Sequence, residues 1–293
     1  MKSMKGIFPA LLTPFTADGR VDEKALRQLV SVNIGRGITG FYVCGSTAES
    51  FLLSLDERKR VLEIVASETA GRAVIICHVG AIGTDLSVDL GKHAVASGAD
   101  AISSIPPFYY KFSEDEIVGY YSDLVERVGA PLIPYNFPLL SGVTLTGELL
   151  KRLRVDPRVI GVKFTSSDLY QLERMKKNDP GLIVYSGFDE IFLGALSMGA
   201  EAAIGSTFNF MPEKFVGIRT YFEQGNFEAA HKLQEEANTV VEALMATGKL
   251  LNAHKYILEL QGIPFGECRR PFLPLTGDDK VRLEAAARRY LKL

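Results

Sequence analysis

The stretch Ser97-Gly98-Ala99-Asp100-Ala101-Ile102-Ser103-Ser104-Ile105 joins the end of a helical pattern to a short apolar run. Its glycine is placed to end a helix, because the residue just past a helix often takes the left-handed conformation that glycine adopts without strain. Met198-Gly199-Ala200-Glu201, which precedes another short apolar run, repeats the arrangement. This junction of helix, glycine and buried strand is the unit that predicts the fold.

The same alternation extends along the chain in both directions. Short apolar runs predict strands at 6–12, 40–44, 74–79, 101–105, 131–135, 159–164, 182–186 and 202–205. Stretches of helical periodicity lie between them, at 22–35, 55–70, 85–97, 113–128, 146–153, 168–177 and 189–198. Eight such repeats favour an α/β fold of the (β/α)8 TIM-barrel type. An open dinucleotide-binding sheet is disfavoured, since no G-x-G-x-x-G follows the first strand.

The last part of the chain has no strand pattern and predicts helices at 212–223, 227–246, 249–260 and 278–291. No low-complexity linker separates these helices from the repeats. We therefore expect a barrel over residues 1–210 and a C-terminal helical appendage over residues 211–293, packed together as one structural unit.

Charge and composition narrow the classes of partner. The formal net charge is −2 and the isoelectric point about 6.2, whereas a nucleic-acid-binding surface is typically strongly basic. Apolar runs fall short of the roughly 20 residues that span a bilayer. The N-terminal residues show no signal-peptide pattern. We expect a cytoplasmic protein that acts on a small molecule.

Cysteine and histidine patterns give no support to a metal site. The three cysteines form no C-x-x-C pair, and the four histidines are scattered without the spacing of zinc ligands. We therefore expect no metal site.

Lys163, in the apolar run Val159-Ile160-Gly161-Val162-Lys163-Phe164, is the strongest chemical anomaly. Alternate residues of a barrel strand face the interior, and the parity predicts the interior side for Val159, Gly161, Lys163 and Thr165. Gly161 is expected to leave space for the lysine. A buried lysine tends to lose its proton, and a neutral amine is the nucleophile that forms an imine with a carbonyl compound. The alternative is a lysine that reaches solvent or pairs with a carboxylate.

Tyr135 ends the strand that precedes the lysine strand, in Ile133-Pro134-Tyr135-Asn136-Phe137-Pro138. Active sites of these barrels lie at the carboxyl ends of the strands, so Tyr135 and Lys163 are expected to be neighbours there. A phenol beside an imine can transfer protons. The alternative is an aromatic residue that only packs.

Three loops add polar groups at the same ends of strands. They are Gly45-Ser46-Thr47-Ala48-Glu49-Ser50, Ser186-Gly187-Phe188-Asp189-Glu190 and Ile204-Gly205-Ser206-Thr207. The first can bind a carboxylate through backbone N–H groups and hydroxyls, and the acidic pair of the second can bind sugar hydroxyls. Each also fits an ordinary turn or the acidic first turn of a helix. Their coincidence with an interior lysine favours a site.

With these motifs in place, the chain resembles the N-acetylneuraminate lyase and dihydrodipicolinate synthase superfamily over essentially its whole length. Gly45-Ser46-Thr47-Ala48-Glu49 resembles its G-[ST]-T-G-E loop, Tyr135-Asn136-Phe137-Pro138 its Y-N-x-P motif, and Gly161-Val162-Lys163 its G-x-K strand. Ser141-Gly142-Val143, the run from Lys163 to Gln171, and Gly187-Phe188-Asp189-Glu190 are most similar to the sialic acid lyase branch. The synthase branch has an arginine where this chain has Leu140, which disfavours a dicarboxylic substrate.

The resemblance implies an aldolase that forms an imine and works as a homotetramer. It also implies that no metal or organic cofactor is needed, because the imine supplies the stabilisation. It implies that Lys163 forms the imine with pyruvate, that Tyr135 transfers protons, and that Tyr109 completes a relay across a subunit interface. Ser46 and Thr47 would hold the keto-acid carboxylate, with Ser46 also in the catalytic set. The sugar chain would be contacted by Thr165, Gly187, Asp189, Glu190 and Ser206.

The resulting prediction is reversible cleavage of N-acetylneuraminate to pyruvate and N-acetylmannosamine. The alternatives are a 2-keto-3-deoxy sugar acid aldolase or dehydratase, the dihydrodipicolinate synthase, and a non-catalytic protein that binds sugar acids. Two positions depart from the pattern: Ala48 replaces a glycine of the family and Ser50 an alanine of the lyases. If that glycine required a positive φ, alanine would be strained by about 1 kcal/mol.

Overall fold

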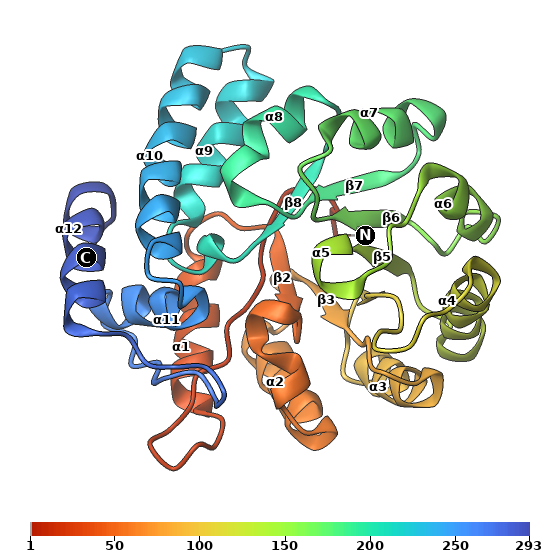
Figure 1. Cartoon of the computed structure of the whole chain (residues 1–293), viewed down its shortest axis with the longest axis horizontal. Helices are drawn as coiled ribbons and strands as arrows, with labels where there is room; N and C mark the ends of the chain where they lie inside the picture. The colour runs from red at the N-terminus through yellow and green to blue at the C-terminus, as the bar shows by residue number, and fades with distance from the viewer. Residues whose placement is uncertain (1) are drawn as a thin grey trace.

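The computed structural model describes residues 2–293 and contains eight parallel strands at the centre of the molecule (Figure 1). They are β1 (Ile7–Pro9), β2 (Gly40–Val43), β3 (Val74–His78), β4 (Ala101–Ser104), β5 (Leu132–Asn136), β6 (Gly161–Phe164), β7 (Ile183–Ser186) and β8 (Ala202–Gly205). Strands adjacent in sequence pair with each other, and β8 pairs with β1. A parallel bridge between Ala10 and Tyr42 joins β1 to β2 and closes the barrel. The predicted fold class is confirmed.

Each strand is followed by a helix of the outer ring. These helices are α1 (Glu23–Ile34), α2 (Leu55–Thr69), α3 (Thr84–Ala96), α4 (Glu114–Val128), α6 (Gly147–Leu153), α7 (Leu169–Asn178), α8 (Phe192–Ser197) and α9 (Pro212–Glu223). Ser54 and Ser113 begin α2 and α4 with capping boxes, in which serine and glutamate satisfy each other's backbone N–H groups. Gly98 and Gly199 have φ values of 88° and 98°, so both predicted glycine junctions are confirmed.

The remaining helices lie on one side of the barrel: α10 (Phe227–Met245), α11 (Leu250–Leu260) and α12 (Gly277–Tyr290) (Figure 1). Helix α10 packs against α9 and α12. Helix α9 itself packs against α8 and β1, which is the position of an eighth outer helix. The division at residue 210 stays a prediction, and this packing leads us to propose a boundary after Glu223 instead. No helix within residues 2–293 is long and apolar enough to cross a membrane.

Two apolar layers position the site. The barrel interior is filled from opposite strands by side chains such as Phe8, Tyr42, Ile133 and Tyr185, and a separate layer lies between strands and helices. On β6, Val162 and Phe164 face the outer layer, as the parity predicts. The prediction is wrong for the two residues before the strand: Val159 packs in the outer layer and Ile160 against the interior. The regular alternation begins only at Gly161, where β6 begins.

Candidate active site

The Lys163 side chain points into the barrel and is 4% exposed. Its Nζ lies 4.1 Å from the centre of the Tyr42 ring and 4.0 Å from that of Tyr135. The lysine therefore does not extend to solvent. Gly161 is required by β7, because a Cβ there would lie 2.5 Å from the Ile183 carbonyl oxygen and 3.1 Å from the Tyr185 ring. The predicted role of Gly161 in leaving space for the lysine stays a prediction.

Burial controls the protonation of this amine. Desolvation lowers the pKa of Lys163 to about 7, and the negative charge of Asp189 opposes the shift. Removal from water disfavours the ammonium form, whereas a nearby carboxylate stabilises it. About half of the lysines are therefore neutral near pH 7, and a neutral amine can attack a carbonyl carbon.

Tyr135 lies beside Lys163, because the two residues are partners in the register of β5 and β6. Its ring is buried and stacks on Phe137 with ring centres 5.8 Å apart. Burial raises the pKa of Tyr135 to about 12, and the hydroxyls of Thr165 and Ser46 oppose that rise. The phenol therefore keeps its proton at neutral pH and acts first as a donor.

The loop after β2 forms two short 3-10 turns, η1 (Ser46–Ala48) and η2 (Ser50–Leu52). Thr13 Oγ1 donates to the Ala48 carbonyl oxygen at 2.9 Å, which ties the first turn to the barrel. The residue in the left-handed conformation is Glu49, with φ of 58°, and Ala48 is not in that region. The expected strain at Ala48 is therefore absent.

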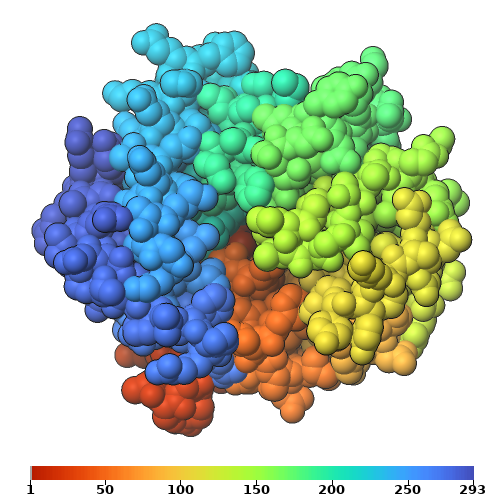
Figure 2. All heavy atoms as spheres, in the orientation of Figure 1, coloured from red at the N-terminus to blue at the C-terminus, as the bar shows by residue number. Residues whose placement is uncertain are grey.

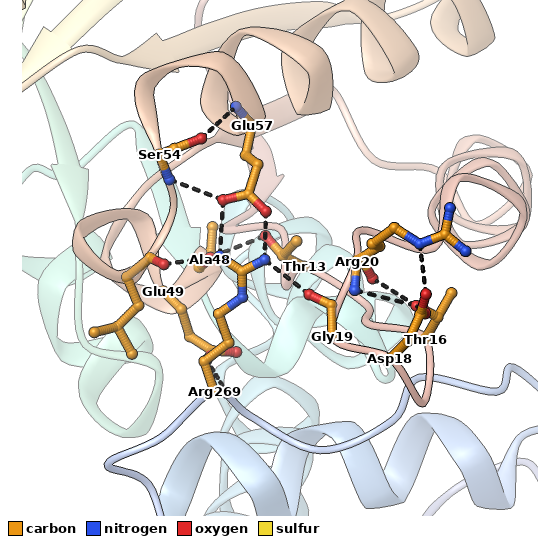
Figure 3. A network of polar contacts seen from close by, with 11 residues as sticks. Thr13, Thr16, Asp18, Gly19, Arg20, Ala48, Glu49, Ser54, Glu57 and Arg269 are labelled. Atoms are coloured by element: carbon orange, nitrogen blue, oxygen red, sulfur yellow. Dashed lines mark hydrogen bonds and ion pairs between the residues drawn. The ribbon is translucent and has the colours of Figure 1, made fainter.

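A buried ion pair supports this loop from behind. Lys255 Nζ, on α11, lies 2.7 Å from Glu49 Oε1, with side chains 1% and 0% exposed. The Arg269 backbone N–H donates to Glu49 Oε2 at 2.8 Å. The Arg269 guanidinium binds the Glu57 carboxylate at the start of α2 and the Gly19 and Leu52 carbonyl oxygens (Figure 3). The C-terminal segment thus fixes the conformation of the turn that carries Ser46 and Thr47.

Asp189 is held at the opposite side of the site. Its Oδ2 accepts from the Thr207 backbone N–H at 2.8 Å and from the Thr207 hydroxyl at 2.7 Å. Burial raises the pKa of Asp189 to about 6, and the two Thr207 bonds oppose that rise. Gly205 permits the arrangement, because a Cβ there would lie 2.1 Å from Asp189 Oδ1.

These groups surround a cavity of about 340 Å³ at the carboxyl ends of the strands. Figure 2 shows a hollow near the middle of this face, where early, middle and late segments of the chain meet. The predicted residues that line the cavity are Ser46, Thr47, Tyr135, Lys163, Thr165, Gly187, Asp189, Glu190 and Ser206. The structure therefore brings together nine predicted residues from five strand ends.

Tyr109 is the predicted residue that lies apart from the cavity. It belongs to the loop between β4 and α4, has a φ of 81° and is 83% exposed. A catalytic role for Tyr109 therefore needs a neighbouring copy of the chain, and it stays a prediction.

Helices α10 and α11 and the segment before α12 supply a wall of the cavity that sequence reasoning missed. Its residues are Val241, Leu244, Met245, Leu250, Leu251, His254 and Phe272. Apart from His254 these residues are apolar, and in the sequence their pattern is that of ordinary helix packing. The signal that could have found the wall is His254, which stands beside Lys255 in a stretch that otherwise has the apolar residues of a packed helix, Leu250-Leu251 before it and Ile257-Leu258 after it.

Fold and site together define a class of protein: a (β/α)8 barrel with a poised amine and a phenol at its mouth, equipped for imine chemistry. A model of the dihydrodipicolinate synthetase family matches residues 3–290, and the chain belongs to this family.

Relatives of known name and structure cover nearly the whole chain. An N-acetylneuraminate lyase from Rhizobium meliloti is 44% identical over 97% of this chain and 94% of its own length. The structure of CdNal from Clostridium difficile, in complex with mannosamine, superposes with a TM-score of 0.96 at 38% identity over 99% of this chain and all of that one. A catalytic lysine mutant of the Ruminococcus gnavus sialic acid aldolase has a TM-score of 0.95 at 30% identity, covering 98% and 97% of the two chains.

Proposed function

We propose that this protein is an aldolase that reversibly cleaves N-acetylneuraminate to pyruvate and N-acetylmannosamine through an imine on Lys163. The observation that carries the proposal is the buried Lys163 amine, with its pKa lowered to about 7, beside the Tyr135 phenol. The names of the relatives, which include N-acetylneuraminate lyase and sialic acid aldolase, support the choice of substrate.

The chemistry follows from the protonation states. Neutral Lys163 attacks the C2 carbonyl carbon of the open-chain sugar acid, and Tyr135 donates its proton to the departing hydroxyl, so that water leaves and an iminium forms. The resulting phenolate takes the proton of the C4 hydroxyl as the C3–C4 bond breaks, and the electron pair of that bond moves into the iminium. The enamine is then protonated at C3 and hydrolysed to pyruvate, which returns Lys163. The imine serves as the electron sink, so the proposal needs no cofactor.

The substrate is held at both ends in this proposal. Ser46 and Thr47 bind the carboxylate, and Thr165, Gly187, Asp189, Glu190 and Ser206 contact the hydroxyl chain, which lies along the same cavity. Leu140, which also lines the cavity, offers no charge for a second carboxylate. This arrangement favours a polyhydroxy acid over a dicarboxylic acid.

The test is pyruvate release from purified protein, coupled to lactate dehydrogenase, with N-acetylneuraminate beside a panel of 2-keto-3-deoxy sugar acids. We expect preferential turnover of N-acetylneuraminate. Preference for a shorter acid would assign the protein to another branch of the family. Lys163→Ala should lose pyruvate release and the adduct trapped by borohydride, and its activity at the wild-type rate would overturn the mechanism.

We also propose a cytoplasmic homotetramer in which Tyr109 acts across a subunit interface. Tyr109 and Tyr110, which are 83% and 65% exposed, provide aromatic surface for a second copy. Light scattering should give four times the mass of one chain. Tyr109→Phe should lower kcat without changing that mass, and an unchanged kcat would remove Tyr109 from the relay.

A further inference from the structure

His254 is a buried histidine on α11 whose ring touches the proposed sugar side of the cavity. Its Nδ1 lies 2.6 Å from the Leu250 carbonyl oxygen, and its Nε2 lies 2.9 Å from Ser206 Oγ. The Phe210 ring packs edge-on against it with centres 5.5 Å apart. The side chain is 1% exposed, so packing fixes the orientation of both nitrogens.

These contacts assign the tautomer. The Leu250 carbonyl oxygen can only accept, so Nδ1 carries the hydrogen. Burial lowers the pKa of His254 to about 4, so the ring is neutral at physiological pH and Nε2 presents a lone pair. The Ser206 hydroxyl therefore donates its single proton to His254.

A serine hydroxyl has one donor and two acceptor positions. Once its proton is used, Ser206 Oγ offers only lone pairs to the cavity. Asp189 and Glu190, on the same side, present carboxylate oxygens. This side therefore accepts hydrogen bonds and suits a ligand rich in hydroxyl or amide N–H groups.

We propose that His254 is a positioning residue that holds Ser206 as a dedicated acceptor for a hydroxyl or amide N–H of the sugar chain. His254 thereby favours polyhydroxylated substrates over short keto acids. The inference rests on the proposed function, because it needs a sugar acid in the cavity.

The test is a double-mutant cycle of wild type, Ser206→Ala, His254→Phe and the double variant, with N-acetylneuraminate as substrate. Phenylalanine keeps the ring against Phe210 and removes both nitrogens. Each single variant should lower kcat/KM about 10-fold, mostly through KM, as expected for one hydrogen bond. Because His254 acts through Ser206, the double variant should be no worse than Ser206→Ala. His254→Gln should recover part of the loss, since its amide oxygen can accept from Ser206.

Two results would overturn the inference: wild-type kinetics in His254→Phe, or losses that multiply to about 100-fold in the double variant. Borohydride trapping of a pyruvate adduct in every variant checks that the imine site is folded, and His254→Leu, which also lacks an acceptor for Ser206, replaces His254→Phe in the cycle if the latter fails this check. A wild-type protein that does not cleave N-acetylneuraminate would instead overturn the proposed function. The cycle is then run on the sugar acid that does release pyruvate.

Discussion

The Lys163 amine needs little besides burial to become a nucleophile. The amine lies over two aromatic rings, and desolvation lowers its pKa against the opposing charge of Asp189. We expect kcat/KM for pyruvate release to fall as pH drops below about 7, by about tenfold per pH unit, because the protonated amine cannot attack. A pH profile of kcat/KM measures this directly.

The Asp189→Asn variant is the matched control for that profile. Because the Asp189 charge stabilises the ammonium form, its removal should lower the pKa of Lys163 and move the acid limb to lower pH. If the acid limb of Asp189→Asn stays at the wild-type pH, another group controls it. An acid limb near pH 10 in the wild-type protein would contradict the effect of burial on Lys163.

At this scale the sequence predicted Lys163 because a charged residue is unusual inside an apolar strand. It predicted Tyr135 because the preceding strand ends there, on the same face of the barrel. It could not predict His254, whose role depends on a contact with Ser206 that joins distant parts of the chain. The contact of Gly161 with β7 was missed for the same reason, since β7 is distant from Gly161 in the sequence.

In the η1 turn, Ala48 stands where the family has glycine, and the reverse substitution tests whether this difference affects stability or substrate preference. Ala48 is buried and outside the left-handed region, so glycine would relieve no strain. We expect Ala48→Gly to lower the free energy of unfolding by about 1 kcal/mol, through lost backbone restriction. Urea denaturation measures this, and kinetics should show the same preferred substrate. A more stable variant, or a new preference, would contradict the prediction.

A substitution at Gly205, the last residue of β8, is expected to cost more stability than Ala48→Gly. In Gly205→Ala the new methyl group would lie 2.1 Å from Asp189 Oδ1 and 2.5 Å from the Phe208 ring. We expect a loss of about 1–3 kcal/mol in the free energy of unfolding, because the packed core must move. Gly119→Ala in α4, where a Cβ meets nothing within 4 Å, is the control and should be slightly stabilising. Equal stability of the two variants in thermal melts would refute the argument.

Elements were predicted better than their ends. All eight strands lie within their predicted ranges to within one residue, but β1 is the three residues Ile7–Pro9 where 6–12 was expected. Ala10 makes only an isolated bridge to Tyr42, and residues 11–12 continue the apolar pattern outside the strand. The apolar pattern does not indicate the residue at which strand pairing ends.

For the whole molecule, the Glu49–Lys255 pair joins the C-terminal helices to the barrel. Lys255→Met would leave the buried Glu49 carboxylate with the Arg269 N–H and no cation at 2.7 Å. We expect a loss of about 3–5 kcal/mol in the free energy of unfolding, since an uncompensated buried charge is strongly destabilising. Denaturant titration provides the measurement.

The double variant Glu49→Gln with Lys255→Met separates the missing charge from lost packing. It should recover most of the stability, because no buried charge remains and glutamine can still accept from Arg269. If the stability losses of the single variants Glu49→Gln and Lys255→Met simply add in the double variant, lost packing and not the missing charge explains the effect.

The cavity wall formed by residues between Val241 and Phe272 has a consequence for the synthesis of the protein. A ribosome makes the chain from its N-terminus, so Lys163 and Tyr135 emerge well before His254 and Arg269. A nascent barrel therefore carries its nucleophile without the wall that closes the cavity or the residues that brace the η1 turn. We therefore expect no pyruvate release from a chain that ends before its last helices, although such a chain already contains Lys163 and Tyr135.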